Sequence, residues 1–184
     1  FHGPSRQVSV EQAIHNGLAM IRNGSEIIDI GGESTRPGSE PVTIREEIER
    51  VIPIIEGLCE QADNPLISID TRNVEVARKA IDAGASMIND VSGLRDDAMK
   101  NLVLDTRVPV CIMHMLGDPK TMQSNPVYSD VVEEVCSKLQ RKATELIDAG
   151  HPAEMICLDP GIGFGKTLQH NVKLLQSHET LRGE

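Results

Sequence analysis

Aromatic side chains are nearly absent from this 184-residue chain, which has no Trp, one Tyr and two Phe. A site that stacks a flat ligand between several aromatic rings is therefore not expected. Any flat ring bound here would have to pack against Met, Phe or Arg side chains, and methionine is the most frequent non-polar candidate with seven copies.

The chain also lacks an excess of basic residues and long apolar runs. Eighteen Lys and Arg stand against 28 Asp and Glu, giving a formal net charge of −10 and a pI near 5.1, so nucleic acid and anionic membranes are not expected partners. No apolar run approaches the ~18 residues of a membrane span, and the first residues show no signal-peptide pattern. We expect a soluble, cytoplasmic protein in which any anionic ligand finds a local positive site.

Cysteine is scarce, and its spacing does not indicate a metal centre. The four cysteines are Cys59, Cys111, Cys136 and Cys157. They form no CxxC motif and no Cys/His cluster, and two of them sit inside apolar, strand-like runs. The pattern predicts reduced cysteines in the core.

What the chain does contain is a repeated alternation of amphipathic helices and short apolar strands, within a length typical of one domain. Capping boxes at Ser9 and Thr43 start two of the helices, and Ser129 and Asp130 open the longest one. Further helices are predicted from about 73, 95 and 167. The predicted strands span 26–32, 65–70, 86–91, 108–115 and 155–159.

Five strands joined by helical crossovers predict a parallel α/β sheet, either doubly wound or part of a (β/α)8 TIM barrel. Polar residues follow the carboxyl ends of these strands, and a barrel brings all such ends to one mouth, whereas an open sheet brings together only two. These residues are Glu33, Asp70, Asn89 with Asp90, His114 and Asp159. We therefore expect residues 1–184 to form one partial barrel domain, truncated at both ends, because a complete barrel has eight strands in about 250 residues.

Three of these polar residues suggest a common ligand. Asp70 or Asn89 alone could simply cap the following helix, but Asp159 precedes Pro160, which has no amide hydrogen to occupy the carboxylate. Ionised carboxylates only accept hydrogen bonds, so together with an amide they suit a ring edge rich in N–H donors. An aminopyrimidinone such as a pterin or a guanine-like ring is indicated.

The glycine-rich segment GIGFGKT (161–167) is not a phosphate loop, because only three residues separate its first glycine from Gly165-Lys166-Thr167, where four are needed. Its glycines, Gly163 among them, would instead let the backbone approach a flat ligand, with Phe164 as a wall.

A second candidate segment is GGESTRPGS (31–39), where Arg36 is the only cation. It could be a solvated surface loop. The functional interpretation is an anion grip, in which Arg36 clamps a phosphate or carboxylate and Thr35 donates a hydroxyl hydrogen bond.

His114 follows a strand and could be a core histidine, a proton-transfer group or a ligand contact. The other histidines are predicted at the surface, and Met113 and Met115 are interpreted as core residues more readily than as a ligand wall. The remaining histidines are His2, His15, His151, His170 and His178.

The motifs, in their order and spacing, resemble dihydropteroate synthase over essentially the whole chain. They read DIGGESTRPG, SIDT, INDVSG, MHMLGDPKTMQ and LDPGIGFGKT. The resemblance implies a (β/α)8 barrel that condenses 6-hydroxymethyl-7,8-dihydropterin diphosphate with 4-aminobenzoate to dihydropteroate and diphosphate. It also implies Mg2+ as cofactor, competition by sulfonamides and a homodimer at full length.

Site roles carried over from this family fall on the residues already singled out. Asp70, Asn89 and Asp159 would hold the pterin. Thr35 and Arg36 would serve the diphosphate and the aminobenzoate, and the lining residues would be Met113, Gly163 and Phe164. Asp70, Arg36 and Asp159 are the catalytic candidates, with Asp70 able to stabilise a pterin cation electrostatically.

Departures from the family pattern limit what this chain alone should do. The family's NVTPDSF segment, whose Asn contacts metal and diphosphate, is not in the sequence, nor are its C-terminal Lys, Arg and His; no metal ligand is predicted in this chain, and weak activity is expected. Arg72 stands where many relatives have a neutral residue. The alternatives are a corrinoid methyltransferase pterin barrel, which should lack STRPG, and a non-catalytic pterin-binding module.

Overall fold

The computed structural model describes residues 9–34, 41–117 and 121–182, which form one parallel sheet flanked by helices. The strands are β1 (Ile27–Gly31), β2 (Leu66–Asp70), β3 (Met87–Asp90), β4 (Val110–Met113) and β5 (Ile156–Asp159). The helices are α1 (Val10–Arg22), α2 (Ile44–Gln61), α3 (Val74–Asp82), α4 (Asp97–Thr106), α5 (Val131–Asp148), α6 (Leu168–Gln176) and α7 (His178–Arg182). A short 3₁₀ helix, η1 (Ala153–Met155), leads into β5 and was not predicted.

The predicted helix starts are confirmed by side-chain capping. Ser9 accepts a hydrogen bond from the Gln12 amide, and Thr43 and Glu46 form a reciprocal capping box at α2. Asp130 caps α5 by accepting from the amides of its second and third residues. Polar residues before the apolar periodicity therefore placed these helices correctly.

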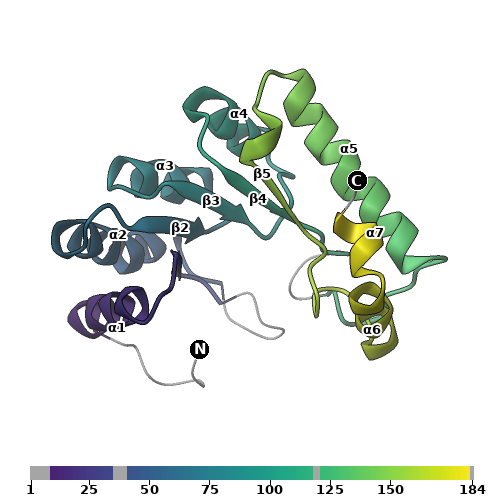
Figure 1. The fold of residues 1–184 in the computed structure, drawn as a ribbon, viewed down its shortest axis with the longest axis horizontal. Coiled ribbons are helices and arrows are strands. Elements are labelled where there is room, and N and C mark those ends of the chain that lie inside the picture. Colours follow the sequence, from purple (N-terminus) through teal and green to yellow (C-terminus); the bar gives the residue numbers. More distant parts are fainter. Residues whose placement is uncertain (1–8, 35–40, 118–120, 183–184) are drawn as a thin grey trace.

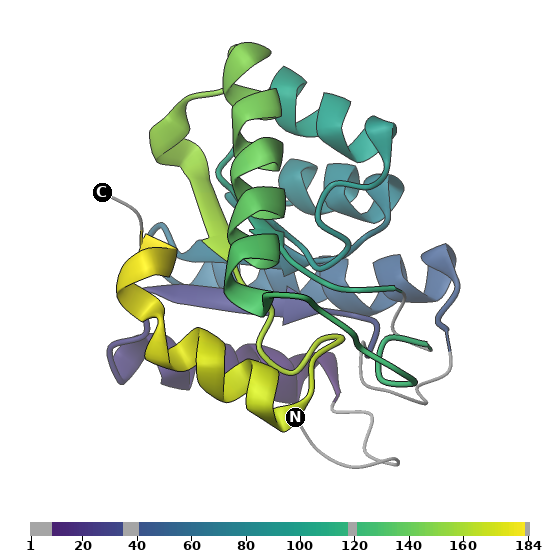
Figure 2. The same cartoon turned by 90° about the vertical axis from the view of Figure 1, so that its right-hand side faces the viewer.

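Strand order decides between the two predicted architectures in favour of the barrel. The sheet runs β1-β2-β3-β4-β5, all parallel, with each strand beside the next in sequence. A doubly wound sheet reverses its order at a switch point, whereas right-handed crossovers in one constant direction place every helix on one face. Figure 1 shows α1 to α5 in an arc outside the sheet, and Figure 2 shows α5 in front of it with α6 and α7 beside it. The five strands form an incomplete barrel.

The core lies between the sheet and this outer layer of helices. Strand residues that alternate toward the helices are almost fully buried, as period-two alternation requires. They pack against the inward faces of the helices; examples are Ile28, Ile30, Ile67, Ile69, Ile88, Val110 and Ile112 with Val51, Ile55, Leu58, Val76, Leu102 and Val135. The other face of each strand points into the concave side, where the polar strand-end residues lie.

Two predictions about burial were wrong. All four cysteines are free, as expected, but none is buried: Cys157 is exposed and the other three are partly exposed. Cys111 and Cys157 are register partners on the concave face, which no described helix covers. His151, predicted at the surface, is 3% exposed because it follows the end of α5 and donates its amide to Leu146.

None of the helices in the described part of the chain has the length and apolar character that a membrane span requires.

Candidate functional site

Asp70 ends β2 and is the direct register partner of Asn89, the last residue but one of the neighbouring strand β3. Asp70 also pairs with Gly31 of β1, and Asp159 at the end of β5 pairs with Met113 of β4. Because neighbouring strands lie about 4.8 Å apart and Asp159 is two residues beyond the register of Asn89, their Cα atoms are roughly 12 Å apart across β4. The structure thus places the three predicted ligand-binding residues along one edge of the sheet, and a ligand contacting all three must extend from β2 to β5.

The alternative that Asp70 and Asn89 are helix caps is wrong. The N-cap of α3 is Asn73 and that of α4 is Asp96, so neither strand-end residue occupies a capping position. The neighbouring Asp90 has the structural role instead: it is fully buried and accepts hydrogen bonds from the amides of Ser92 and Leu94. Strand alternation therefore sends Asn89 to the concave side and Asp90 to the helix side.

The carboxyl group of Asp70 lies in an acidic environment. Burial raises its pKa to about 7, and the neighbouring carboxylates Asp29, Glu47, Asp90 and Glu33 add to the shift. At neutral pH this group is close to half protonated. A ligand that brings N–H donors or positive charge to it would be favoured electrostatically, and perturbed carboxyl groups of this kind mark functional sites.

Asp29 belongs to the same acidic group and was missed from the sequence. It lies in the middle of β1, pointing to the concave side, and the Asn89 side-chain amide approaches its two carboxylate oxygens at 3.5 and 3.4 Å. A charged residue inside the run EIIDIGG was the available signal. A strand buried on both faces would not hold an unpaired carboxylate, so its presence points to a polar inner face.

Glu47 supports the end of β2 and was also missed. This α2 residue is fully buried, and its carboxylate accepts hydrogen bonds from the Thr71 hydroxyl at 2.6 Å and from the Asn73 side-chain amide. Both donors lie in the turn directly after Asp70. Glu47 therefore fixes the turn that positions Asp70, and its place in a helical pattern offered no signal of this.

Asp159 is only partly available to a ligand. Pro160 has no amide hydrogen, as predicted, but the next residue supplies one: the Gly161 amide donates to Asp159 Oδ1 at 2.7 Å. This bond orients the carboxylate at the start of the glycine-rich loop. Within the described residues its Oδ2 accepts no hydrogen bond, which leaves one oxygen for a ligand donor.

Lys166 anchors that loop to the end of β4 and was not predicted. Its ammonium group is buried and lies 3.1 Å from His114 Nδ1, and it donates to the carbonyl oxygens of His114, Gly161 and Phe164 at 3.2, 2.9 and 3.0 Å. Burial lowers the Lys166 pKa to about 8. A buried lysine in a segment with no helical or strand periodicity leaves no trace in the sequence.

His114 is a buried histidine in contact with Lys166; its burial fits the core-histidine interpretation, while its unbonded Nε2 leaves the ligand-contact interpretation open. It is 4% exposed, and burial together with the nearby Lys166 and Lys138 charges lowers its pKa to about 4. The imidazole is neutral at physiological pH. Its Nδ1 faces the Lys166 ammonium, so Nδ1 is the acceptor and the ring proton sits on Nε2.

The glycines of the loop have different roles. A Cβ at Gly161, whose φ is +66°, would collide with the His114 carbonyl oxygen, so this glycine allows the loop to pack on β4. At Gly163, φ is +87° but a Cβ would meet nothing within 4 Å. Gly163 instead receives a hydrogen bond at its carbonyl from Gln123 at 2.6 Å and donates its amide to Asn171 at 2.9 Å.

Met113 and Phe164 belong to one small apolar cluster at this end of the sheet. Its other members are Val91, Met115 and Met122, and Phe164 is the partly exposed residue among them. Because Phe164 keeps an exposed surface beside Asp159, it remains the candidate wall for a flat ring. Met113 is 4% exposed and therefore contributes mostly to packing.

The β1 end is held by an ion pair that explains Arg72. Its guanidinium donates to both Glu33 carboxylate oxygens, at 2.9 and 3.0 Å, and Glu33 also accepts from the Val42 amide. This bidentate pair ties the segment after β1 to the turn after β2. Thr35 and Arg36, the predicted anion grip, lie outside the described residues.

The described residues contain no group of three or more His, Cys, Asp or Glu side chains arranged to hold a metal ion. The concave edge of the sheet combines three acidic side chains, one amide and an apolar wall, a combination suited to the donor edge of a small heterocycle.

Fold and site together define a partial (β/α) barrel whose strand ends carry hydrogen-bond acceptors suited to a ring with N–H donors. The comparisons with known proteins give the family: residues 1–184 match the model described as pterin binding enzyme. The chain belongs to the pterin-binding enzyme family.

Several of the similar proteins are named dihydropteroate synthase. The chain is 41% identical over 169 residues to dihydropteroate synthase of Haemophilus influenzae, covering 92% of this chain and 61% of that protein. Among solved structures, Yersinia pestis dihydropteroate synthase with a sulfonamide drug has a TM-score of 0.91 at 38% identity, covering 95% of this chain and 63% of that one. The Burkholderia cenocepacia enzyme complexed with 7,8-dihydropteroate has a TM-score of 0.86 at 45% identity, covering 94% and 61%. The chain thus spans about 60% of the curated relatives it matches.

Proposed function

We propose that the full-length protein containing this chain is a dihydropteroate synthase, which condenses 6-hydroxymethyl-7,8-dihydropterin diphosphate with 4-aminobenzoate. The observation that carries the proposal is the acidic strand-end group around Asp70 in a chain of the pterin-binding family. The similar proteins support it, since they bear that name and one of them holds 7,8-dihydropteroate. A corrinoid methyltransferase barrel has no comparable support.

In this proposal the acceptors hold the pterin by its donor edge. The ring N–H and the exocyclic amine of an aminopyrimidinone lie side by side, so one carboxylate can accept from both. Asp159 has an unoccupied oxygen for this purpose and Asn89 offers both an acceptor and a donor. Phe164 and the backbone at Gly163 would line the ring, with Met113 behind them.

The reaction exchanges one bond for another at the exocyclic methylene of the pterin. The C–O bond to the diphosphate breaks, the leaving group takes the bonding electrons, and the aminobenzoate nitrogen forms a C–N bond and then loses a proton. Positive charge on the pterin is greatest after diphosphate departs. Asp70, as a carboxylate, would stabilise that charge in a partly buried site, where electrostatic interactions are strengthened.

The proposal also covers the binding of the diphosphate and the aminobenzoate, the metal ion and the assembly of the full-length protein. Thr35 and Arg36 would bind the diphosphate and the aminobenzoate, and Mg2+ would accompany the diphosphate through ligands that the described residues do not supply. A homodimer in the cytoplasm is proposed for the full-length protein, and sulfonamides would compete with 4-aminobenzoate.

The test is an assay of the full-length protein with labelled 4-aminobenzoate and dihydropterin diphosphate in the presence of Mg2+. We expect labelled dihydropteroate from the wild type, at least about a hundredfold less from Asp70→Asn, and wild-type rates from Asp148→Asn, the same change at an exposed α5 position. Normal pterin binding without any product would overturn the enzyme proposal and leave a pterin-binding module.

A further inference from the structure

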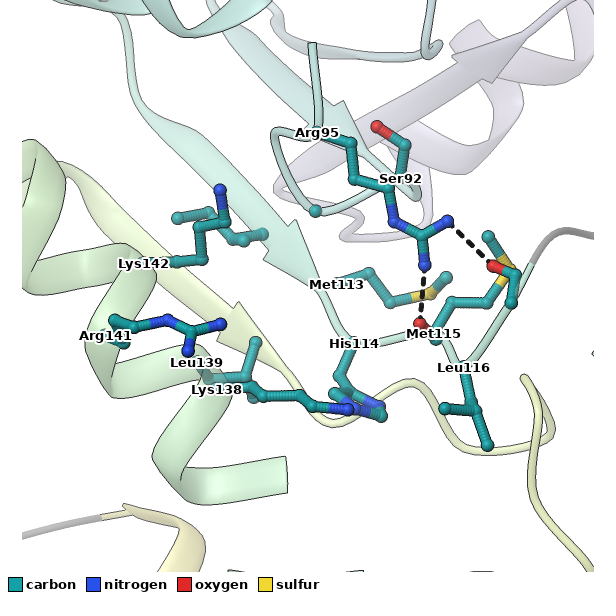
Figure 3. Close-up of a pocket in the computed structure, with 13 residues that line it drawn as sticks. Ser92, Arg95, Met113, His114, Met115, Leu116, Lys138, Leu139, Arg141 and Lys142 are labelled. Atoms are coloured by element: carbon teal, nitrogen blue, oxygen red, sulfur yellow. Dashed lines mark hydrogen bonds between the residues drawn. The ribbon is translucent and has the colours of Figure 1, made fainter. Parts of the chain in front are cut away.

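An open cavity lies on the helix side of the sheet, beside the end of β4. It has a volume of about 290 Å³ and is lined by the β3–α4 turn, the end of β4 and the side of α5. Asp70, Asn89 and Asp159 do not line it. Four basic side chains do, in a chain whose net charge is −10: Arg95, Lys138, Arg141 and Lys142. Figure 3 shows three of them projecting from α5.

His114 lines the same cavity and has an unsatisfied donor. The Lys166 ammonium lies 3.1 Å from Nδ1 and would repel an N–H there, so we assign the proton of the neutral ring to Nε2. Nε2 is buried and has no hydrogen-bond partner. A buried N–H without an acceptor costs free energy, so an acceptor is expected beside it.

Lys138 is the basic residue whose charge is still available. Arg95 donates to the carbonyl oxygens of Met115 and Gly117, as the dashed lines in Figure 3 mark, while Lys142 donates to Leu94. Arg141 and Lys142 also face Glu145. Among the described residues Lys138 has neither a hydrogen bond nor an ion pair, and Figure 3 shows its side chain extending from α5 toward the His114 ring.

The Lys138 charge acts on His114 and both residues line the cavity, where a cation and an N–H donor repel unless an acceptor lies between them. That acceptor should be negatively charged, because it then offsets the field of several basic side chains at once. The apolar walls of the cavity, formed by Ile112, Leu116 and Leu139, would accommodate a small non-polar body attached to the charged group.

We propose that this cavity is a binding site for a small oxyanion, a phosphate or a carboxylate, with one oxygen accepting from His114 Nε2 and paired with Lys138. The site shares Met113 with the proposed pterin pocket, but Asp70, Asn89 and Asp159 do not line it, so the proposal does not depend on the proposed function. Lys166 has a positioning role in it, since it fixes the tautomer that presents the Nε2 proton.

The test follows the His114 imidazole and the Lys138 side chain by NMR in the full-length protein, labelled with ¹⁵N and ¹³C. Inorganic phosphate is titrated in one series and acetate in another, each exchanged against chloride at constant ionic strength. We expect a saturable shift of the His114 Nε2 signal. Lys138→Met should weaken the affinity about tenfold, because a charged partner is lost.

Lys79→Met is the matched control, since it removes the same charge from an exposed position on α3. Its affinity should stay within about twofold of the wild type, as expected for a charge far from the site. A response to phosphate alone assigns a phosphate site, and a response to both assigns a general oxyanion site. If neither anion shifts His114, or if both variants weaken binding equally, the proposal is overturned.

Discussion

The two halves of the functional edge carry opposite electrostatic environments. At the β2–β3 end, burial and the carboxylates around Asp70 raise its pKa to about 7. At the β4–β5 end, burial and the lysines around His114 lower its pKa to about 4. Neighbouring strands of one sheet thus disfavour negative charge at one position and positive charge at another.

The difference indicates where a donor-rich ligand would be favoured electrostatically and where the sheet holds the glycine-rich loop. Around Asp70 the acidic groups repel one another, and a donor-rich ligand would relieve that repulsion. At the β4–β5 end the Lys166 ammonium donates to three carbonyl oxygens and contacts His114 Nδ1, so it holds the glycine-rich loop in place. We expect substitutions of Lys166 and of the loop glycines to affect stability most, and substitutions of the strand-end carboxylates Asp70 and Asp159 to affect binding.

The largest effect on stability should come from Lys166→Met. This change leaves the carbonyl oxygens of His114, Gly161 and Phe164 without their donor and should lower the free energy of unfolding by roughly 3 kcal/mol. Urea unfolding measures it. Lys173→Met, which breaks only an exposed ion pair with Asp130, should cost less than about 1 kcal/mol. Equal losses in the two variants would contradict a supporting role for Lys166.

The next largest loss of stability should come from Gly161→Ala, which should destabilise the protein more than Gly163→Ala in the same loop. Gly161→Ala introduces both a strained left-handed backbone and a collision with the His114 carbonyl, while Gly163→Ala introduces the strain alone. We expect losses of about 3 and about 1 kcal/mol respectively in the free energy of unfolding. If thermal and urea unfolding give the same value for both, the loop does not pack on β4 as described.

The raised pKa of Asp70 should make the free energy of unfolding depend on pH. Because the folded-state pKa of Asp70 is raised, its contribution to stability is present at low pH and is lost as the pH rises from about 4 through 7. Asp70→Asn should therefore stabilise the protein by about 1.5 kcal/mol above pH 7 and by little at pH 4. Unfolding by urea across this pH range, with Asp148→Asn as control, measures the difference; a gain that does not vary with pH would refute it.

His114 should make the free energy of unfolding change with pH in the opposite direction to Asp70. Its folded-state pKa is depressed, so its contribution is present above about pH 6.5 and is lost as the pH falls through 4. His114→Gln should remove that loss and leave the Asp70 slope visible alone. If the free energy of unfolding changed with pH in the same way in Asp70→Asn and His114→Gln, the two ends of the sheet would not differ electrostatically as described.

The smallest effect should come from the ion pair at the β1 end. Glu33 and Arg72 form a bidentate contact, but the Arg72 side chain is 40% exposed, so solvent screening limits the coupling to about 0.5–1 kcal/mol. A double-mutant cycle with Glu33→Gln and Arg72→Ala measures it. Coupling above about 2 kcal/mol would place this pair among the supporting interactions instead.

The main helices and strands could be predicted from the sequence, because capping residues and hydrophobic periodicity are local properties. The barrel could be predicted because polar residues follow the carboxyl ends of all five strands, and a barrel brings these ends together. Thr43, Asp130 and the strand ending at Asp70 are examples. The roles of Lys166 and Glu47 could not be predicted from the sequence, since they depend on packing between segments that are distant in the chain. The burial of Cys157 was misjudged because alternation alone does not say whether the concave face is covered.

The most direct test of the central claim is the dissociation constant of 6-hydroxymethyl-7,8-dihydropterin for the full-length protein, measured by calorimetry in matched Asp→Asn variants. Asp70→Asn and Asp159→Asn should each weaken binding at least about tenfold, and Asp148→Asn should leave it unchanged. Wild-type affinity in both strand-end variants would contradict the assignment of this acidic edge as the pterin site.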